Sequence, residues 1–368
     1  MQPKLLIIKV FLVLFFGVSL NLNAQNTSGI KFINGNDLTV LGRSNTVPHD
    51  SFCRIDSIWL DKLPKRVAEL SSNSTGMSIL FQTDSKSISI KWTLLKFNTI
   101  WNMTPLSING LDLYGWNGEK WQFVASARPT SITNSVTVID HLDGKLRCYR
   151  FYLPLYSGVK DIEVGIEKEA VINKAPSEFI PSKKVVIYGS SITQGTSASR
   201  PGMAYPSIAG RDMNIETFNM GFSGSGKMEI ELADIIAKMD ADVYILDCVA
   251  NPSPKEIHQR AIPFIRRLRS LKPKIPIILV ESIFREKGNW SELNGNYVNN
   301  QNKEFREAYT QLMAENFTKL YYVPSEALIG NDHEATIDGT HLTDLGFTRL
   351  AKRIEEELRE VFKIESAD

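Results

Sequence analysis

The hydrophobic pattern of this chain changes character near Lys183. Before that point, short segments such as 87–94 and 161–166 alternate apolar and polar residues. Such alternation places one face of a strand against a core and the other face in solvent. After Lys183 the apolar residues form continuous runs, as in 185–188 and 243–246, and segments with helical periodicity separate these runs. The two patterns bury strands in different ways, which predicts two domains of different class.

The first pattern predicts an antiparallel β domain over residues 25–178. Further short runs of the strand type occur at 77–81, 121–124, 135–139 and 146–151. Three dipeptides that favour tight turns lie between these runs: Asn109-Gly110, Asn117-Gly118 and Asp143-Gly144. Several short strands joined by hairpin-type turns are typical of a sandwich, and we expect a jelly-roll-like one.

The second pattern predicts an α/β domain over residues 183–368. A third continuous apolar run lies at 275–280. Segments with helical character lie at 228–239, 255–271, 304–317 and 343–362. Strands that are apolar on both faces and alternate with helices indicate a parallel sheet covered on both sides. A polar, Pro-containing connector over 175–184 separates the two domains.

The first residues have the composition of a secretory signal peptide. A basic start accompanies an apolar run over residues 5–20, and the small residue Ala24 precedes a polar segment. A bilayer core takes about 20 apolar residues, so we favour a cleaved peptide over residues 1–24 rather than a membrane anchor. No later segment is apolar enough to span a membrane. The mature chain is therefore expected to begin near Gln25 and to be periplasmic or extracellular, without stable membrane insertion.

Charge and cysteine content narrow the classes of partner. The 368 residues carry a formal net charge of +1, which argues against nucleic acid because phosphate binding needs clustered Lys and Arg. The three cysteines have no metal-site spacing, and we expect no metal. Cys53 and Cys148 could form a disulfide, a pairing that sequence leaves open. Cys248 lies in an apolar run, which favours a buried thiol.

Ser191 is the first candidate for chemistry. It follows the apolar run 185–188 in the sequence Gly189-Ser190-Ser191. Ligands of open parallel sheets gather at the carboxyl ends of the strands, so a nucleophile there is well placed. Taken alone, a Gly-Ser-Ser turn is more often a helix N-cap than a nucleophile.

A base is available near the C-terminus in Asp338-Gly-Thr-His341. A Ser hydroxyl needs a base to take its proton, and His titrates in the right range. A neighbouring carboxylate would orient the imidazole and stabilise its protonated form. The alternative is a turn-forming Asp beside an incidental His.

Two further residues could stabilise an oxyanion. Gly224 lies in the Gly-rich segment 219–226, and Asn251 follows the run 243–248. Backbone N–H groups and a side-chain amide at strand ends could both donate to developing negative charge. The alternative is an ordinary turn before a helix in each case.

Taken together and in this order, the four segments resemble those of the SGNH (GDSL-type) hydrolase superfamily. The resemblance implies a flavodoxin-like catalytic domain with Ser191 as nucleophile, His341 as general base and Asp338 orienting it. It also implies an oxyanion hole formed by Ser191, Gly224 and Asn251. The chain departs from the family pattern at Ser190, where Asp is common, and in Val-Ala-Asn-Pro at 249–252, where Gly-x-Asn-Asp is common.

The β domain also carries a family resemblance. The sequence Asn-Gly-Leu-Asp-Leu-Tyr-Gly at 109–115 is similar to the Gly-x-Asp-Leu-Tyr (GxDLY) signature of a domain that precedes some bacterial SGNH modules. Arg200 and Tyr205 follow the nucleophile segment closely and are candidates for substrate binding, with a surface or core role as the alternative for each.

These features predict an exported serine esterase that removes short acyl groups, O-acetyl above all, from carbohydrates. The expected partner is a small acylated substrate or an acylated glycan, and no cofactor is needed. A lipid or thioester hydrolase is the first alternative, and a carbohydrate-binding protein with a degenerate hydrolase domain is the second. Sequence leaves open the natural ester, the oligomeric state and whether the β domain contributes to the active site.

Overall fold

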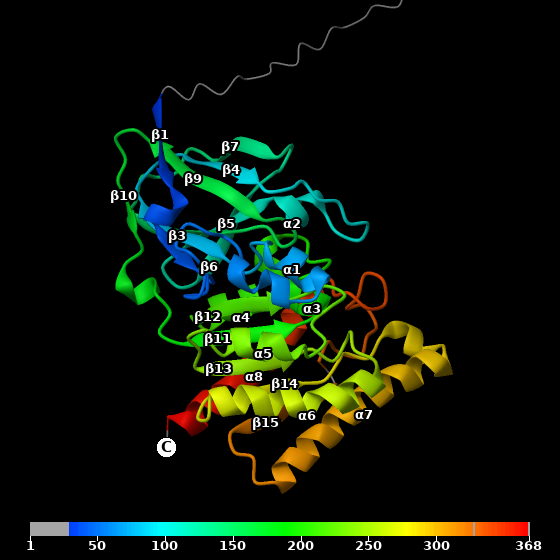
Figure 1. Ribbon diagram of the computed structural model, residues 1–368. Helices are drawn as coiled ribbons and strands as arrows, with labels where there is room; N and C mark the ends of the chain where they lie inside the picture. The colour runs from blue at the N-terminus through cyan, green and yellow to red at the C-terminus, as the bar shows by residue number, and fades with distance from the viewer. Residues whose placement is uncertain (1–28, 327, 367–368) are drawn as a thin grey trace, which may run out of the picture.

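The computed structural model describes residues 29–326 and 328–366. Figure 1 shows an antiparallel β domain stacked on an α/β domain, with the two in direct contact. This arrangement confirms the predicted fold classes and their order along the chain. The signal peptide predicted over residues 1–24 lies outside the described residues.

Two antiparallel sheets form the N-terminal domain. One sheet has the strand order β1 (Ile30–Asn34), β9 (Val159–Glu167), β4 (Ile88–Leu94) and β7 (Thr133–Ile139). The other has the order β10 (Ile172–Lys174), β3 (Ser78–Thr83), β8 (Arg147–Tyr152), β5 (Leu111–Trp116) and β6 (Trp121–Ala127), and β2 (Thr39–Leu41) also pairs with β3. Alternate side chains from both sheets, among them Phe81, Ile90 and Phe151, share one buried core. The domain is therefore a sandwich.

Short helices occupy several connections of this domain. They are η2 (Gly35–Asp37), η3 (Ser57–Lys62), α1 (Lys65–Ser71), α2 (Pro105–Asn109) and η4 (Ser177–Phe179). The prediction of a hairpin turn at Asn109-Gly110 was wrong, because Asn109 ends α2. Thr104 caps this helix by accepting the N–H of Ser107, and Pro105 occupies the first turn, where its missing N–H costs nothing.

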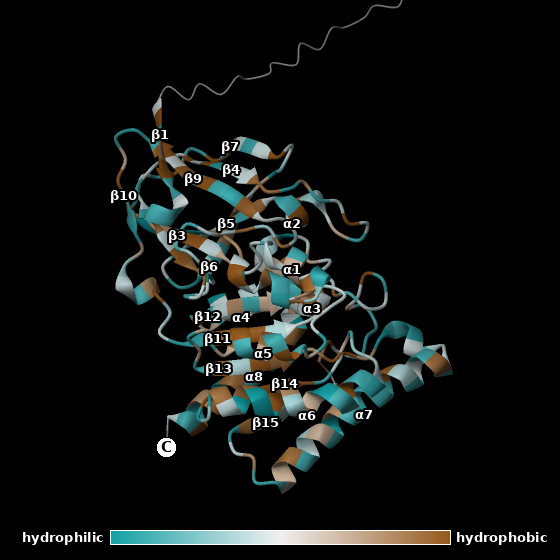
Figure 2. Ribbon diagram, viewed as in Figure 1, coloured by the Kyte–Doolittle hydropathy of each residue, from teal (hydrophilic) through white to brown (hydrophobic). Residues whose placement is uncertain are grey.

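A five-stranded parallel sheet forms the centre of the C-terminal domain. Its order is β12 (Glu216–Gly221), β11 (Lys184–Gly189), β13 (Val243–Asp247), β14 (Ile277–Val280) and β15 (Leu320–Val323). Numbered within the domain, this is the order 2-1-3-4-5 of flavodoxin-like sheets. Figure 2 shows mostly hydrophobic strands, whereas hydrophilic residues mark α6 and α7.

Helices cover both faces of this sheet. The helical segments are α3 (Ser191–Gln194), η5 (Pro201–Met203), α4 (Tyr205–Asp212), α5 (Ile230–Ile236), α6 (Pro254–Leu271), η6 (Glu286–Asn289), α7 (Glu292–Ala314) and α8 (Asp344–Glu365). Side chains of α5, α6 and α7 share one core with the sheet, and those of α4 and α8 share another. The strands are therefore buried on both sides, as their continuous apolar runs predicted.

Helix α7 begins twelve residues earlier than the pattern indicated, at Glu292 instead of 304. Its first half is rich in Asn and Gln, which hides the helical periodicity. Two of these polar side chains are buried and form hydrogen bonds with distant loops. Gln301 donates to the carbonyl of Val249, and Asn302 pairs with the backbone of Ser282. Because contacts from distant loops stabilise this segment, local sequence could not reveal it.

The cysteines Cys53, Cys148 and Cys248 are free thiols. Cys248 is fully buried, as predicted, and burial raises its pKa well above the ordinary value. Among residues 29–326 and 328–366, no helix has both the length and the hydropathy needed to cross a membrane.

Candidate active site

The candidate residues gather at the carboxyl edge of the parallel sheet. Ser191 lies two residues after the end of β11, Gly224 follows β12 and Asn251 follows β13. Asp338 and His341 lie between β15 and α8. Parallel strands deliver their C-terminal loops to one edge, so residues far apart in the sequence meet there.

Ser191 begins the short helix α3, and its neighbour Ser190 caps that helix. The Ser190 hydroxyl accepts the N–H of Ile192 at 3.2 Å and has no exposed surface. Gly221 allows the close approach of α3, because a Cβ there would lie 2.3 Å from the backbone nitrogen of Gln194. Ser190 is thus committed to the helix, and Ser191 is left to face the site.

A tight hairpin presents Asp338 and His341 side by side. The carbonyl of His341 accepts the N–H of Ile337 at 2.8 Å, and Asp338 Oδ1 accepts the backbone N–H groups of Thr340 and His341. His341 Nδ1 lies 2.7 Å from Asp338 Oδ2, and His341 Nε2 lies 3.1 Å from Ser191 Oγ. An ionised carboxylate can only accept hydrogen bonds, so Nδ1 keeps the ring hydrogen and donates it to Asp338, which leaves the lone pair of Nε2 facing the Ser191 hydroxyl.

The environment of Asp338 keeps its carboxyl group ionised. Partial burial acts to raise the pKa, but hydrogen bonds from the backbone and ring of His341, and from Asn102, lower the pKa to about 2. With the Thr340 N–H, four donors surround this one charged group and favour its charged form. The site therefore holds a permanent negative charge behind His341 at neutral pH.

Two backbone N–H groups beside Ser191 are available for an oxyanion. Gly224 has φ 71°, and no atom lies within 4 Å of the position a Cβ would take. Within the described part of the chain, neither the Ser191 N–H nor the Gly224 N–H has an acceptor. Asn251 Nδ2 donates one hydrogen to the carbonyl of Ser225, which holds its amide against the Gly224 loop and leaves a second hydrogen.

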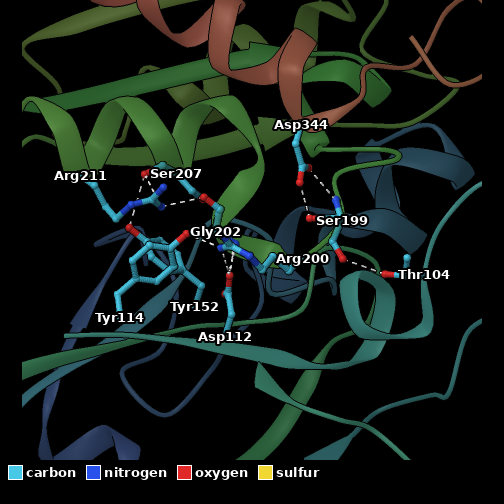
Figure 3. Close-up of polar contacts among 10 residues, drawn as sticks. All are labelled: Thr104, Asp112, Tyr114, Tyr152, Ser199, Arg200, Gly202, Ser207, Arg211 and Asp344. Carbon is cyan, nitrogen blue, oxygen red and sulfur yellow. Dashed lines mark hydrogen bonds and ion pairs between the residues drawn. The ribbon is translucent and has the colours of Figure 1, made fainter. Parts of the chain in front are cut away.

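Arg200 does not line the site, contrary to its candidacy for substrate binding. Its guanidinium pairs with the buried Asp112 at 2.9 Å and donates to the Tyr114 hydroxyl (Figure 3). Asp112 also accepts the N–H of Gly202. Asp112 and Tyr114 are the Asp and Tyr of the GxDLY signature, so this signature binds the segment that follows α3. A charged side chain already paired across the domain interface is not free for substrate.

Tyr205 is also wrongly placed for substrate binding. It is completely buried, and its hydroxyl donates to Asp247 Oδ2 at 3.0 Å. The same oxygen accepts the Thr193 hydroxyl at 2.7 Å. Tyr205 and Asp247 thus stabilise α3 through the hydrogen bond between Asp247 and Thr193. Burial raises the pKa of Asp247 to about 6, although both hydrogen bonds act to lower it.

Asp247→Asn should remove a pH dependence of stability. Because the folded-state pKa of Asp247 lies above its unfolded value, the contribution of Asp247 to stability is lost as pH rises from about 4 through about 6. The free energy of unfolding of the variant, relative to wild type, should therefore improve by about 3 kcal/mol between about pH 4 and about pH 8. Urea unfolding of both proteins at the two pH values measures this difference. A difference that does not change with pH would show that Asp247 does not titrate in this range.

Sequence reasoning missed Asn102, which belongs to the N-terminal domain. Its Nδ2 donates to Asp338 Oδ2 at 2.9 Å, across a separation of 236 residues. An isolated Asn in a loop of another domain carries no local signal of such a contact.

A groove of about 600 Å³ opens beside the Gly224 loop. Gly224 and Ser225 form part of its wall. The rest of the lining includes the charged side chains of Lys227, Glu256 and Arg260 and the apolar side chains of Pro64, Met228, Ile230 and Pro263. Across residues 29–326 and 328–366, no group of three or more His, Cys, Asp or Glu residues is arranged to hold a metal ion.

Two family models match the chain. Residues 182–359 match the GDSL-like lipase/acylhydrolase family, and residues 30–172 match the GxDLY domain, the N-terminus of SGNH-type esterases. A comparison with curated proteins found no match.

Solved structures share both domains. A Bacteroides ovatus protein assigned as a GDSL-like lipase is 38% identical, with a TM-score of 0.87 over 91% of this chain and 98% of that one. The salicylyl-acyltransferase SsfX3 of a tetracycline biosynthetic pathway is 16% identical, with a TM-score of 0.72 over 90% and 97%. An acetyl xylan esterase, Est2A, from the rumen bacterium Butyrivibrio proteoclasticus is 13% identical, with a TM-score of 0.55 over 90% and 99%. The latter two likenesses show the shared fold alone. On the family models and the first of these structures, the chain belongs to the GDSL-like lipase/acylhydrolase family of SGNH hydrolases and is an ester-bond hydrolase.

Proposed function

We propose that this protein is an exported serine esterase that removes short acyl groups, O-acetyl above all, from carbohydrates. The observation that carries the catalytic part is the relay from Ser191 Oγ through His341 to Asp338, with heavy-atom distances of 3.1 and 2.7 Å. These are hydrogen-bond distances in the order that a nucleophile, a base and an orienting carboxylate require.

The proposed reaction has two steps. His341 Nε2 takes the proton of Ser191 as Oγ attacks the ester carbonyl, and the imidazolium then returns that proton to the departing alcohol. His341 next activates a water molecule, which hydrolyses the acyl-serine and releases the acid. The N–H groups of Ser191 and Gly224, with the Asn251 amide, would stabilise the oxyanion, each donor contributing about 3 kcal/mol.

Two observations support a carbohydrate ester with a small acyl group. The exposed rings of Trp101 and Trp290, 85% and 93% exposed, belong to loops that bond the Asp338 hairpin through Asn102 and Glu286. Such rings can pack against the apolar face of a sugar. A protein of the same fold is an acetyl xylan esterase.

A series of chromogenic esters from acetate to octanoate, together with a panel of acetylated polysaccharides, tests this proposal. We expect the highest kcat/KM with acetate and release of acetate from at least one polysaccharide, both lost in Ser191→Ala. A maximum with long acyl chains or with thioesters would favour the lipid or thioester alternative. A wild-type protein that hydrolyses no ester and resists a serine-directed phosphonate would favour the carbohydrate-binding alternative. Acyl transfer to an added alcohol in preference to water would instead indicate an acyltransferase.

The export part of the proposal rests on residues 1–24. Expression of the full chain in a bacterium, followed by N-terminal sequencing of the mature protein, should give a start near Gln25. A protein that keeps its first residues would contradict export by a cleaved peptide.

A further inference from the structure

Asn102 is a buried polar residue in a partly exposed turn of the N-terminal domain. It lies between β4 and α2 and is 7% exposed, whereas its neighbour Trp101 is 85% exposed. The chain therefore points the Asn102 amide inward, toward the C-terminal domain. Burying an amide has a cost that only hydrogen bonds offset.

The backbone carbonyl and the side-chain amide nitrogen of Asn102 both form hydrogen bonds with the C-terminal domain. Its backbone carbonyl accepts the Ser197 hydroxyl at 2.9 Å, and its Nδ2 donates to Asp338 Oδ2 at 2.9 Å. The flanking side chains of Ile100 and Met103 pack against the hydrophobic core of that domain. Asn102 is thus held on both sides and cannot swing away from Asp338.

Neighbouring contacts tie the same turn to the loop after the nucleophile helix. The Thr104 hydroxyl donates to the carbonyl of Ser199 at 2.9 Å, and the Ser199 N–H donates to Asp344 at 2.9 Å. Figure 3 shows these bonds beside the Arg200–Asp112 pair, so one short loop is fastened to both domains. The N-terminal domain is therefore docked at a point within a few residues of both Ser191 and Asp338.

The Asn102 amide completes the coordination of the Asp338 carboxylate. Asp338 Oδ1 accepts two backbone N–H groups of its own hairpin. Asp338 Oδ2 accepts His341 Nδ1–H at 2.7 Å and Asn102 Nδ2–H at 2.9 Å. Asn102 Nδ2 and His341 Nδ1 lie 3.3 Å apart; because both carry hydrogen, they do not bond each other but converge on one oxygen. The two donors together fix the plane of the carboxylate and hence the direction in which His341 points.

We propose that Asn102 is a positioning residue through which the N-terminal domain completes the active site. It orients Asp338, and through Asp338 the His341 ring, without touching the substrate. This inference rests on the proposed function, since it assigns Asn102 to the same Ser191–His341–Asp338 relay.

Asn102→Ala should lower kcat by about 10- to 100-fold and leave KM within about twofold, because a loosened carboxylate misorients the base without altering substrate contacts. The matched control is Asn134→Ala. Asn134 is a buried Asn of the same domain, and its side chain accepts the N–H groups of Thr130 and Ser131. The control should lose thermal stability but keep the kcat of wild type for the folded fraction.

Asn102→Asp gives a second readout that a purely structural role would not produce. The substitution keeps the size and the Ser197 contact but brings a second carboxyl group against Asp338. Two carboxylates in contact share a proton at low pH, and that proton restores a donor to Asp338. The ratio of kcat/KM for this variant to wild type should therefore rise as pH falls below about 7, whereas the ratio for Asn102→Ala should stay constant.

These measurements use the full chain with a chromogenic acetate ester, and thermal unfolding verifies that each variant is folded. A kcat for Asn102→Ala within twofold of wild type, or an equal loss in Asn134→Ala, would overturn the positioning role. A pH-independent ratio for Asn102→Asp would overturn it as well, even where Asn102→Ala folds poorly. Failure of the proposed function is distinguishable, because wild type itself would then show no hydrolysis that Ser191→Ala abolishes.

Discussion

Ser191→Ala should lower kcat for ester hydrolysis by about 10⁵-fold or more, because removal of the hydroxyl leaves no nucleophile for the acyl-enzyme. The residual rate would come from the oxyanion donors and from substrate binding alone. Steady-state hydrolysis of a chromogenic acetate ester and labelling with a serine-directed phosphonate both measure the effect. The variant should remain folded, since Ser191 Oγ bonds only His341 among the described residues.

Ser190→Ala is the matched control for this experiment. Ser190 caps α3 through Ile192, so its replacement should cost about 1 kcal/mol of stability and keep activity within an order of magnitude. The reverse outcome, with activity lost in Ser190→Ala and kept in Ser191→Ala, would show that the nucleophile is Ser190 and that the proposed assignment to Ser191 is wrong.

The second large effect is expected for Asp338→Asn, which should lower kcat by about 10³- to 10⁴-fold at neutral pH. An amide can donate its own hydrogen to His341 Nδ1, which places the ring proton on Nε2 and turns it toward Ser191. The base would then face the nucleophile in the wrong tautomer. The kcat of the variant and of wild type, compared at saturating acetate ester, measures the loss.

The pH dependence of wild-type activity tests whether Asp338 stays ionised across the working range of pH. Because hydrogen bonds hold the pKa of Asp338 at about 2, its charge stabilises the folded protein above its unfolded pKa, and this contribution is lost only as pH falls through about 2. An acid limb of the activity profile at higher pH must therefore come from a group other than Asp338. Activity of Asp338→Asn near that of wild type would contradict an orienting role for the carboxylate.

The interface between the domains gives the GxDLY signature a structural meaning. Asp112 is fully buried in the N-terminal domain, yet it binds Arg200 and the N–H of Gly202. A Cβ at Gly202 would lie 2.7 Å from the Tyr114 ring, so only glycine allows this approach. The signature thus binds the loop after α3 to the N-terminal domain. Its residues are used in this contact between the domains, and the signature therefore does not indicate which substrate the protein takes.

Local periodicity was sufficient for much of the fold. Alternation over 87–94 and 161–166 predicted β4 and β9, and continuous apolar runs predicted β11, β13 and β14. It was insufficient where distant contacts decide the local structure, as in the Asn-rich start of α7, where Gln301 and Asn302 are bonded to other loops. A pattern along the chain cannot register stabilising partners that lie 52 residues away, as Val249 does from Gln301, or 20 residues away, as Ser282 does from Asn302.

The candidate site divides in the same way. The Asp-x-x-His spacing is local, so a turn could place Asp338 beside His341, although the spacing alone left an incidental His as the alternative. The glycines around Ser191 marked a strand-to-helix turn. Arg200 and Tyr205 were misjudged because sequence proximity to Ser191 does not tell which way a side chain points; folding buried Tyr205 and paired Arg200 with Asp112.

Sequence by itself determined the two domain classes, because these depend on the local periodicity of apolar residues, and the resemblance to SGNH hydrolases supplied the candidate serine, histidine and aspartate. Only the tertiary structure decided three further points. Ser190 caps α3, the GxDLY signature binds the loop at Arg200, and Asn102 donates a hydrogen bond to Asp338. The last contact joins residues 236 positions apart. Such contacts arise from the packing of one domain on the other. The geometry of that interface depends on residues from many parts of the chain, so no single segment of the sequence predicts it.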